Sequence, residues 1–571
     1  MKNFAFLKKS SLPLVIGIIL IPFFSSAQKA SLPVTKAKLF HQEKPRDKYL
    51  PNAFENEKVS PGYKFNNTNS RKSSLGSTIF TNQVNVNTNG QNILGDAANE
   101  PSIAINPTNI NKIAVGWRQF DNVLSNFRQA GWGYSADSGK NWTFPGVIEP
   151  GIFRSDPVLD YDNNGNFYYN SLTNSPSFQC KVFKSTNGGM TWDAGVDAAG
   201  GDKQWMVIDR TSGPGSGNIY SFWSSFYSVC PGLNFTRSST QGNSFESCTF
   251  VNGDPALGTM SIGSNGELYI AGYGNGFDSL IVCKSSNVNI PGSTILWNDS
   301  VPVYMDGFIG FGGINPDGIV GQVNIEAGKN NLLGQSNVYL LASLVRNSIL
   351  DPSDVIFSKS NDGGLTFSAP IRINDDLSEI NNQWLGTISV APNGRIDVVW
   401  LDTRDDITGM DLSALYYSYS INQGNTWSVN EKLSDSFDPH VGYPNQNKMG
   451  DYFDMESDNI GAHLAWANTL NGEQDVYYSY IIPPAPTSIN ELLNGLKFTV
   501  YPNPSNGKFT ILSDEKKSDV EIFTLLGDKI YAVGGYTINN EIDISTQPAG
   551  VYFLKIKNQK GKTGVKKIIK N

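Results

Sequence analysis

Ser185-Thr-Asn-Gly-Gly-Met-Thr-Trp192 is the stretch that decides the fold, because four further segments of the chain repeat its pattern. Each copy begins with serine, has a short polar residue at the third position and glycine at the fifth, and ends in tryptophan or phenylalanine. The five copies begin 50, 53, 122 and 60 residues apart, so they form a repeat rather than a chance match. The other four are Ser135-Ala-Asp-Ser-Gly-Lys-Asn-Trp142, Ser238-Ser-Thr-Gln-Gly-Asn-Ser-Phe245, Ser360-Asn-Asp-Gly-Gly-Leu-Thr-Phe367 and Ser420-Ile-Asn-Gln-Gly-Asn-Thr-Trp427.

The pattern is typical of a tight turn between two antiparallel strands. The third side chain can accept hydrogen bonds from backbone amides of its own turn, and glycine permits the positive φ that such a turn needs. We therefore predict a structural role for the turn residues and expect the aromatic ring to be buried. The residues concerned are Asp137, Gly139, Trp142, Asn187, Gly189, Trp192, Asp362, Gly364, Phe367, Asn422, Gly424 and Trp427.

A second repeat precedes the turns. Pairs of short apolar strands occur seven times between residues 96 and 483, for example Ile388-Ser-Val-Ala-Pro-Asn-Gly-Arg-Ile-Asp-Val-Val-Trp400. The turns are Asp boxes, also called BNR repeats, and this part of the chain resembles the sialidase superfamily of β-propellers. The resemblance implies an all-β fold with the boxes between the third and fourth strands of each blade. Seven strand pairs predict seven blades of about 55 residues each, and six blades, as in sialidases, is the alternative.

The seventh repeat stops at Tyr477-Tyr-Ser-Tyr480 without an outer strand. An open sheet edge needs a partner. The segment Thr78-Ile-Phe-Thr-Asn-Gln-Val-Asn-Val86 is strand-like and lies just ahead of the first repeat. We predict that it closes the last blade.

Charge and composition exclude several classes of function. The net charge of −8 conceals −22 on residues 81–493, where 41 acidic residues stand against 19 basic ones. Such a body repels phosphate backbones, so no nucleic-acid partner is expected. Only three histidines and four cysteines occur in 571 residues, which argues against a zinc hydrolase.

The two ends of the chain indicate export. Residues 1–27 combine three lysines, an apolar run and Ser25-Ser26-Ala27, which predicts a cleaved signal peptide and no transmembrane segment in the mature chain. Residues 28–77 are expected to be a flexible leader, residues 78–483 the propeller and residues 484–493 a linker.

Residues 494–571 alternate polar and apolar residues, which predicts a small Ig-like β-sandwich. Three ordered motifs and a Lys566-Lys567 tail resemble the type A C-terminal sorting domain of the type IX secretion system of Bacteroidetes. The resemblance implies the type IX machinery as a partner, and release or attachment at the cell surface. The motifs are Tyr501-Pro-Asn-Pro504 with Gly507, Leu526-Gly527-Asp528 and Gly550-Val-Tyr552.

An acidic residue recurs just before the first strand of five repeats, at Glu100, Asp156, Asp202, Asp254 and Asp451. These strands begin at the channel mouth opposite the Asp boxes. Glu100, Asp202 and Asp254 are the candidate ligands of a metal, with Ca²⁺ as the possible cofactor, while Asp156 and Asp451 are candidate acid/base groups. The alternative is that each acid caps a turn or pairs with a basic neighbour.

Arg118, Arg154 and Arg404 are expected on the same face, where the sialidase resemblance implies that arginines grip a substrate carboxylate. Tyr452, beside Asp451, is the candidate nucleophile of a sialidase-like pair. The Arg-Ile-Pro motif that carries a sialidase's first arginine is missing, and Arg118 and Arg404 have acids within three residues. Local ion pairing is therefore the alternative for both.

Trp205 and Trp384 each follow a glutamine at what the repeat suggests are matching positions, where a ring could stack on a sugar or pack between blades. His440 lies in the longest connection between blades and is a candidate substrate-binding residue or general base, with a solvated loop histidine as the alternative. Cys230 and Cys248 lie in one blade, close enough in sequence for a bridge.

Two classes of function remain. The propeller binds or processes extracellular glycans at the channel mouth opposite the Asp boxes; as an enzyme it would be an exo-sialidase-like glycoside hydrolase or a polysaccharide lyase. Alternatively, it is a non-catalytic adhesion or protein-interaction propeller whose partner is a surface protein. Fold alone does not decide between them.

Overall fold

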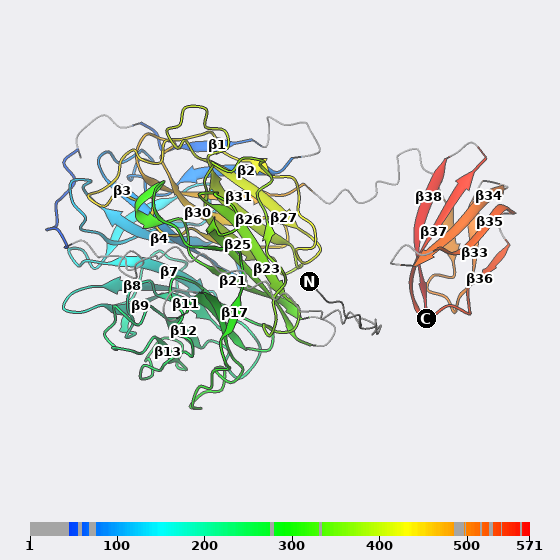
Figure 1. Cartoon of the computed structure of the whole chain (residues 1–571), viewed down its shortest axis with the longest axis horizontal. Helices are drawn as coiled ribbons and strands as arrows, with labels where there is room; N and C mark the ends of the chain where they lie inside the picture. Colours follow the sequence, from blue (N-terminus) through cyan, green and yellow to red (C-terminus); the bar gives the residue numbers. More distant parts are fainter. Residues whose placement is uncertain are drawn as a thin grey trace, which may run out of the picture.

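A computed structural model of the chain describes residues 45–54, 60–67, 76–274, 279–330, 334–484, 496, 498–513, 515, 517–524, 529–537, 540–559 and 562–571. Within these ranges every regular element is a β-strand, and there is accordingly no helix long and apolar enough to cross a membrane. Two separate sets of sheets occur, one before residue 483 and one after residue 497 (Figure 1). The predicted signal peptide and most of the predicted linker lie outside the described residues, and the boundaries at residues 27, 77, 483 and 493 stay predictions.

The first set contains seven antiparallel sheets, which we number as blades 1–7. Blade 1 is β3 (Ala97–Ile105), β4 (Ile113–Phe120), β5 (Gln129–Ser135) and β6 (Thr143–Ile148). Blade 2 is β7 (Ser155–Tyr161), β8 (Phe167–Thr173), β9 (Gln179–Ser185) and β10 (Val196–Asp197). Blade 3 is β11 (Trp205–Ile208), β12 (Ile219–Phe222) and β13 (Phe235–Ser238), and blade 4 is β14 (Met260–Ile262), β15 (Leu268–Tyr273), β16 (Leu280–Ser285) and β17 (Val301–Val303).

Blade 5 is β21 (Asn324–Asn330), β22 (Ser336–Arg346), β23 (Asp354–Ser360) and β24 (Ile371–Arg372), with the short β18 (Gly307–Phe308) also paired to β22. The connection before β21 carries a separate hairpin of β19 (Phe311–Gly312) and β20 (Asn315–Ile319). Blade 6 is β25 (Gln383–Val390), β26 (Ile396–Asp402), β27 (Ala414–Ser420) and β28 (Glu431–Lys432). Blade 7 is β29 (Asp454–Ser457), β30 (Ala462–Asn468), β31 (Asp475–Ile482) and β2 (Thr78–Gln83), and β1 (Lys64–Asn66) extends it outward.

The seven sheets form a closed ring, because the inner strand of each blade contacts that of the next and β29 contacts β3. Side-chain oxygens link neighbouring inner strands by accepting backbone N–H groups. Ser102 Oγ accepts from Leu159 N at 2.8 Å, and Asp160 Oδ2 accepts from Ile208 N at 2.6 Å. Asp454 Oδ2 accepts from Ile103 N at 3.0 Å, which joins the last blade to the first.

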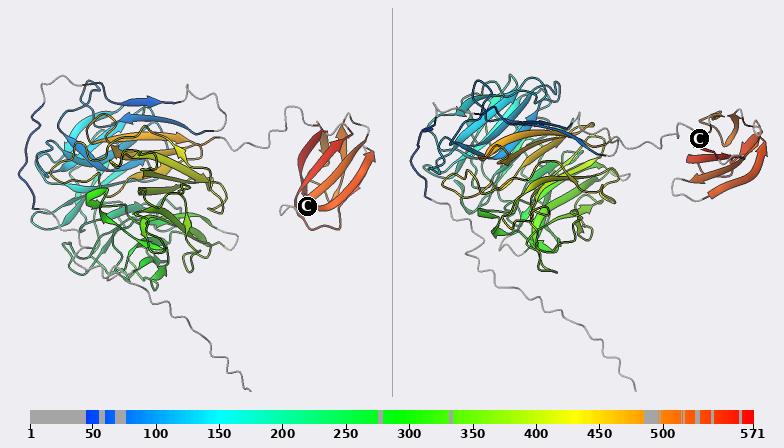
Figure 2. Two further views of the ribbon diagram at one scale, coloured as in Figure 1. Left: turned by 45° about the horizontal axis from the view of Figure 1, so that its top comes forward. Right: turned by 90° about the horizontal axis from the view of Figure 1, so that it is seen from above.

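The predicted closing strand is confirmed. Thr78–Gln83 pairs along β31, from Thr78 opposite Ile482 to Gln83 opposite Tyr477. Figure 2 shows this blue segment beside the gold strands of the last blade, although about 400 residues separate them along the chain. The open edge of blade 7 is thereby covered by a strand from the other end of the propeller.

The turns after the third strands have the predicted hydrogen bonds. In the first, Asp137 Oδ1 accepts from Asn141 N at 2.9 Å and Ser135 Oγ accepts from Gly139 N at 2.9 Å. Asn187, Asp362 and Asn422 accept from the amide four residues on in the same way. The five fifth-position glycines have φ between 71° and 85°. The aromatic residues at the ends of the turns are half-buried, so the expectation that they are buried is met only in part.

The predicted flexible leader is ordered in part. Asp47 N donates to Asn126 Oδ1 at 2.8 Å, and Tyr49 packs edge-on against Phe127 with ring centroids 5.7 Å apart. Farther on, Lys64–Asn66 pairs with β2. Blade 1 and blade 7 therefore offer these residues specific partners, which composition alone did not reveal.

The C-terminal set is a small β-sandwich. One sheet has β32 (Phe498–Tyr501), β33 (Lys508–Ser513) and β36 (Glu541–Asp543), and the other has β35 (Lys529–Thr537), β34 (Lys517–Thr524), β37 (Gly550–Asn558) and β38 (Thr563–Lys570). Alternate residues of both sheets fill one apolar core that includes Ile511, Ile522 and Leu554. The Leu526-Gly527-Asp528 motif lies outside the described residues.

Candidate functional site: the central channel

The strand order gives the propeller two different ends. Strands in a blade alternate in direction, so the turns after first and third strands share one end, which we call the box face. Ser138 N in the first box donates to Asn111 O in the neighbouring first turn, at 3.0 Å. The loops after second strands and the connections between blades share the opposite end, which we call the loop face.

A left-handed residue marks the start of most inner strands. Glu100, Asp156 and Lys203 have φ of 50°, 48° and 56°, and in blades 1 and 2 the strand register shifts at that residue. Leu257 and Leu385 have φ of 59° and 53° at the corresponding points of blades 4 and 6. A bulge of this kind re-aims the side chain, here toward a common cluster in blades 1, 2 and 3.

That cluster, which we call the buried ion cluster, contains Glu100, Arg118, Asp156, Lys203, Lys448 and Asp451. Glu100 forms ion pairs with Arg118, whose Nε lies 3.0 Å from Oε2, and with Lys448, whose Nζ lies 2.9 Å from Oε1. Asp451 Oδ2 accepts from Lys448 Nζ at 2.6 Å and also pairs with Lys203, which lies 3.8 Å from Asp156 Oδ2. None of the six side chains is more than 4% exposed.

Ion pairing determines the pKa values of Asp156 and Lys203 in the buried ion cluster. Burial raises the pKa of Asp156, but the charges of Lys203 and Arg118 outweigh burial and hold that pKa well below its usual range. Burial lowers the pKa of Lys203, but Asp451 and Asp156 raise it well above its usual value. Three carboxylates thus face three cations, so the formal charges of the buried ion cluster balance. Glu100, Asp156 and Asp451 therefore pair with basic groups, which is the alternative to metal binding or acid/base chemistry.

The cluster does not suit the predicted Ca²⁺ ligation. Glu100 is already ion-paired with two cations, which would repel a metal ion placed beside it. Asp202, the neighbour of Lys203, is buried. Asp254 has a left-handed φ of 51°, like Glu100, but its carboxylate already accepts from Ser225 Oγ and Asn234 Nδ2 of blade 3. Among the described residues no three His, Cys, Asp or Glu side chains are grouped to hold a metal ion.

The three predicted arginines are held in separate ion pairs. Arg118 belongs to the buried ion cluster, and Arg154 pairs with Glu149 and donates to Ser171 O. Arg404 pairs with Asp402 at 2.8 Å and Asp375 at 2.6 Å on the loop face of blade 6. Arg404 thus pairs with an acid two residues away, as local pairing predicts, whereas Arg118 pairs with Glu100 on the neighbouring strand rather than with the nearby Asp121.

The other predicted residues divide between core and channel. Tyr452 is buried and donates to Pro157 O at 2.8 Å, and burial raises the pKa of its hydroxyl well above the usual value. Trp384 is fully buried, with its indole N–H donating to Ser413 Oγ. His440 is half-buried, 3.3 Å from both Ile314 O and Asp438 Oδ1. Cys230 and Cys248 form a disulfide in blade 3.

Trp205 and Trp384 differ because the bulge shifts their register. Trp205 follows its left-handed residue by two positions, whereas Trp384 precedes its own by one. An odd difference in register turns a side chain to the other face of a strand. Trp205 therefore lines the channel, and Trp384 packs in the core with Leu401 and Trp466.

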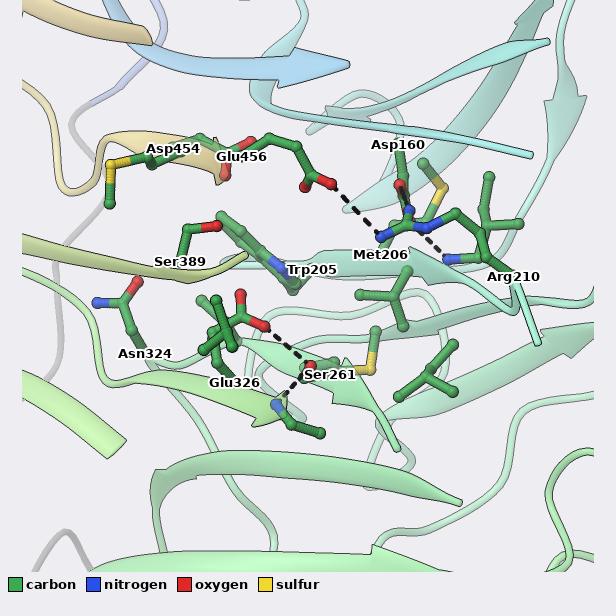
Figure 3. A pocket seen from close by; sticks show the side chains of 18 of the residues that line it. Asp160, Trp205, Met206, Arg210, Ser261, Asn324, Glu326, Ser389, Asp454 and Glu456 are labelled. Atoms are coloured by element: carbon green, nitrogen blue, oxygen red, sulfur yellow. Dashed lines mark hydrogen bonds and ion pairs between the residues drawn. The ribbon is translucent and has the colours of Figure 1, made fainter. Parts of the chain in front are cut away.

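On the box-face side of Trp205 the channel widens into a cavity of about 440 Å³ (Figure 3). All seven inner strands contribute to its wall, and the exposed residues Arg210, Ser212 and Ser264 lie at its box-face rim. Trp205 packs edge-on against Tyr452, with ring centroids 5.4 Å apart. The cavity therefore lies at the end of the channel opposite the one predicted from the sequence.

Four carboxyl groups and one guanidinium line this cavity: Asp160, Glu326, Asp454, Glu456 and Arg210. Arg210 pairs with Asp160, lies 3.9 Å from Glu456 Oε1 and stacks 4.2 Å above the ring of Tyr161. Burial, followed by the charge of Glu456, raises the pKa of Glu326 to about 8. Burial raises the pKa of Asp454 to about 6 despite its hydrogen bonds from Ser102 and Ile103.

Sequence reasoning missed these five residues and Lys448. The acids stand within inner strands, as in Val158-Leu-Asp-Tyr161, where period-two alternation places every second side chain toward the channel. A carboxyl group in an otherwise apolar inner strand was the available signal. Lys448 had none, because it comes from a connection between blades that follows no repeat.

Residues 499–571 match the family described as "Secretion system C-terminal sorting domain". No curated protein matches the chain.

Solved structures similar to this chain include a protein of unknown function from Dyadobacter fermentans, with 14% identity, a TM-score of 0.40 and coverage of 68% of this chain and 95% of that one. PorZ, a surface component of the type IX secretion system of Porphyromonas gingivalis, has 15% identity, a TM-score of 0.34 and coverage of 80% and 58%. A leech intramolecular trans-sialidase has 11% identity, a TM-score of 0.36 and coverage of 53% and 64%.

The sorting domain is the feature on which localisation rests. It directs type IX export, so the machinery of that system is a partner of this chain. The protein is an exported all-β chain, secreted or held at the cell surface.

Proposed function

We propose that the exported propeller binds an extracellular glycan, and that the site is the channel cavity on the box face. The observation that carries the proposal is the cavity itself, in which a tryptophan ring and several carboxyl and hydroxyl groups converge. Sugars are bound through aromatic contact with their C–H faces and hydrogen bonds to their hydroxyl groups. A volume of about 440 Å³ is in the range of small-molecule sites.

The polar lining supports a sugar better than an apolar ligand. Glu326 accepts a hydrogen bond from Ser261 Oγ at 3.1 Å, and Ser389 and Thr387 add hydroxyl groups from blade 6. The buried ion cluster supports the same choice of site, because its side chains are at most 4% exposed and are occupied by one another. The loop-face end of the channel therefore offers a glycan no free carboxylate or arginine of that cluster.

A glycan array probed with the purified mature chain tests this proposal. Val390 lines the cavity on β25 and is half-buried, so Val390→Trp fills the space and is expected to abolish binding. Val429 is 79% exposed in the same blade, so Val429→Trp adds the same ring outside the cavity and serves as the matched control. The proposal fails if no glycan binds, or if the two variants bind equally at equal melting temperature.

Adhesion to a protein is the second candidate, favoured by the loop face. Leu350, Leu377, Ile380 and Ile407 are 83–98% exposed on three loops of blades 5 and 6. The loops lie side by side, because Ser353 O accepts from Gln383 N and Asn382 O accepts from Thr403 N. Exposed apolar tips of this kind mark interaction surfaces.

The two candidates predict different variants to be defective. If adhesion operates, Leu377→Ser with Ile407→Ser abolishes attachment of the purified protein to a surface-protein-coated layer, and Val390→Trp has no effect. If only Val390→Trp abolishes attachment, the loop face is not the adhesive surface.

A further inference from the structure

The cavity has an imbalance of charge that its own residues do not correct. Four carboxyl groups face one guanidinium. That guanidinium is already paired with Asp160 and near Glu456, and its flat face lies on Tyr161. In Figure 3 the labelled carboxyl groups extend into the cavity from different inner strands around Trp205.

Glu326 and Asp454 have only neutral partners. Glu326 accepts from Ser261 Oγ, and Asp454 accepts from Ser102 Oγ at 2.5 Å and Ile103 N at 3.0 Å. Across the described ranges neither carboxyl group forms an ion pair with a lysine or arginine. This contrasts with the buried ion cluster, where every carboxylate has a cation.

In the absence of a cation, protons offset the charge. Glu326 faces Glu456 and Asp454 from β29 and Arg210 beyond β11. Its pKa is raised to about 8 by burial first and by the charge of Glu456 second, and Arg210 opposes this shift. A bound cation would replace the proton, because it interacts favourably with the ionised carboxylate.

Building on the glycan site proposed above, we propose that the cavity binds an amino sugar, with the ammonium group among Glu326, Asp454 and Glu456 and the sugar ring against Trp205. Two features of the wall favour this ligand. Carboxylates bind an ammonium by charge-assisted hydrogen bonds, and a tryptophan face attracts both C–H groups and cations. An acidic sugar such as sialic acid would meet four carboxyl groups and an arginine that is already paired.

The test compares two ligands that differ in charge and acetylation. Isothermal titration calorimetry at pH 6 measures the affinity of the mature chain for the β-1,4-linked tetramer of glucosamine and for the fully N-acetylated tetramer. We expect the glucosamine tetramer to bind about tenfold more tightly, and the preference to shrink in 0.5 M salt because screening weakens it. Glu456→Gln is expected to reduce the preference several-fold. Glu379→Gln, on an exposed loop-face position, is the matched control and is expected to change nothing.

A second measurement detects the proton that Glu326 releases when the ligand binds. If the ammonium displaces the proton of Glu326, binding at pH 6 releases up to one proton, measured as a dependence of the observed heat on the ionisation enthalpy of the buffer. Glu326→Gln removes that release. Release that persists in Glu326→Gln would contradict the placement of the ammonium.

The outcomes separate this inference from the proposed function. If neither tetramer nor any other glycan binds, the glycan site itself is wrong. If both tetramers bind equally, or sialyllactose binds more tightly, the glycan site holds and the ammonium preference is wrong. If spermidine binds as tightly as the glucosamine tetramer, the site recognises an amine and the sugar is not part of recognition.

Discussion

Gly139→Ala tests the structural role of the box turns. Gly139 has φ of +79°, and a Cβ placed on it would lie 2.1 Å from Cε1 of Tyr478. Tyr478 is fully buried in blade 7 and its hydroxyl lies 2.7 Å from Nδ1 of His463, so the ring cannot move outward without breaking this contact. The substitution therefore combines backbone strain with overpacking of the interface between blades 1 and 7.

The two costs can be separated with a matched glycine. Gly394 has φ of +91° with no atom within 4 Å of its Cβ position, so Gly394→Ala introduces the strain alone. A left-handed alanine costs about 1 kcal/mol, and overpacking a filled core adds roughly 1–3 kcal/mol. We expect Gly139→Ala to lower the free energy of unfolding by about 3 kcal/mol and Gly394→Ala by about 1 kcal/mol.

Urea denaturation and thermal melting of both variants provide the measurement. For a body of this size, 3 kcal/mol corresponds to a fall in Tm of about 4 °C. Glycan binding by the surviving folded protein should be unchanged, because Gly139 does not line the cavity. Equal losses of stability in the two variants, or a Gly139→Ala protein that melts normally but fails to bind, would refute the structural role.

Three further predictions concern charge and closure. Because burial raises the folded pKa of Glu326 from 4.5 to about 8, the free energy of unfolding is highest below about pH 4.5 and falls as pH rises to about 8, by roughly 5 kcal/mol. Glu326→Gln should remove this decline, and a variant with the same pH profile as the parent would contradict the prediction. Deletion of residues 60–86 removes β1 and β2 and exposes the edge of β31, so the shortened protein should aggregate, as measured by gel filtration. Deletion of residues 28–44 is the control and should cause no aggregation. Equal behaviour of the two deletions would refute the closing role of β2. Lys448→Met removes a cation that pairs with Glu100 and Asp451, so it should lower the free energy of unfolding in urea by about 3–5 kcal/mol. Adding Glu100→Gln should recover part of this loss. If Lys448→Met leaves the free energy of unfolding unchanged, the buried ion cluster does not stabilise the fold.

The architecture could be predicted because it is repeated. Each turn fixes its own geometry with three local residues, so five copies give blade spacing without knowledge of long-range contacts. The closing strand could be predicted by counting strands, because the last repeat lacked an outer strand and one unassigned strand-like segment preceded the first repeat.

The site could not be placed in the same way, because a single left-handed residue changes which face a side chain occupies. Trp205 and Trp384 have the same preceding residue but lie on different sides of that bulge. Asp254 matches the Gly-Asp-Pro pattern and is left-handed, but a second left-handed residue, Leu257, follows it before β14. Propensity and spacing do not reveal where a bulge falls, so the aligned acids were only partly equivalent.

The sequence also did not reveal which cations balance the charges of the acids in the channel. The acids of the channel follow the repeat, whereas the cations that pair with them come from different positions: Arg118 from a second strand, Lys203 from a bulge and Lys448 from a connection between blades. A pattern search therefore finds a ring of negative charge and misses the groups that close it. The open cavity lies instead where four carboxyl groups of the inner strands face one cation, Arg210.

Hydrogen–deuterium exchange of the mature chain, with and without the tightest glycan from the array, tests most directly whether the ligand occupies the box-face cavity. We predict slower exchange in peptides that contain residues 205–212, 259–264 and 454–457, which line or adjoin the cavity. Slower exchange confined to the loop-face segments 121–128, 346–353 and 403–411, with the cavity strands unchanged, would contradict the proposed site.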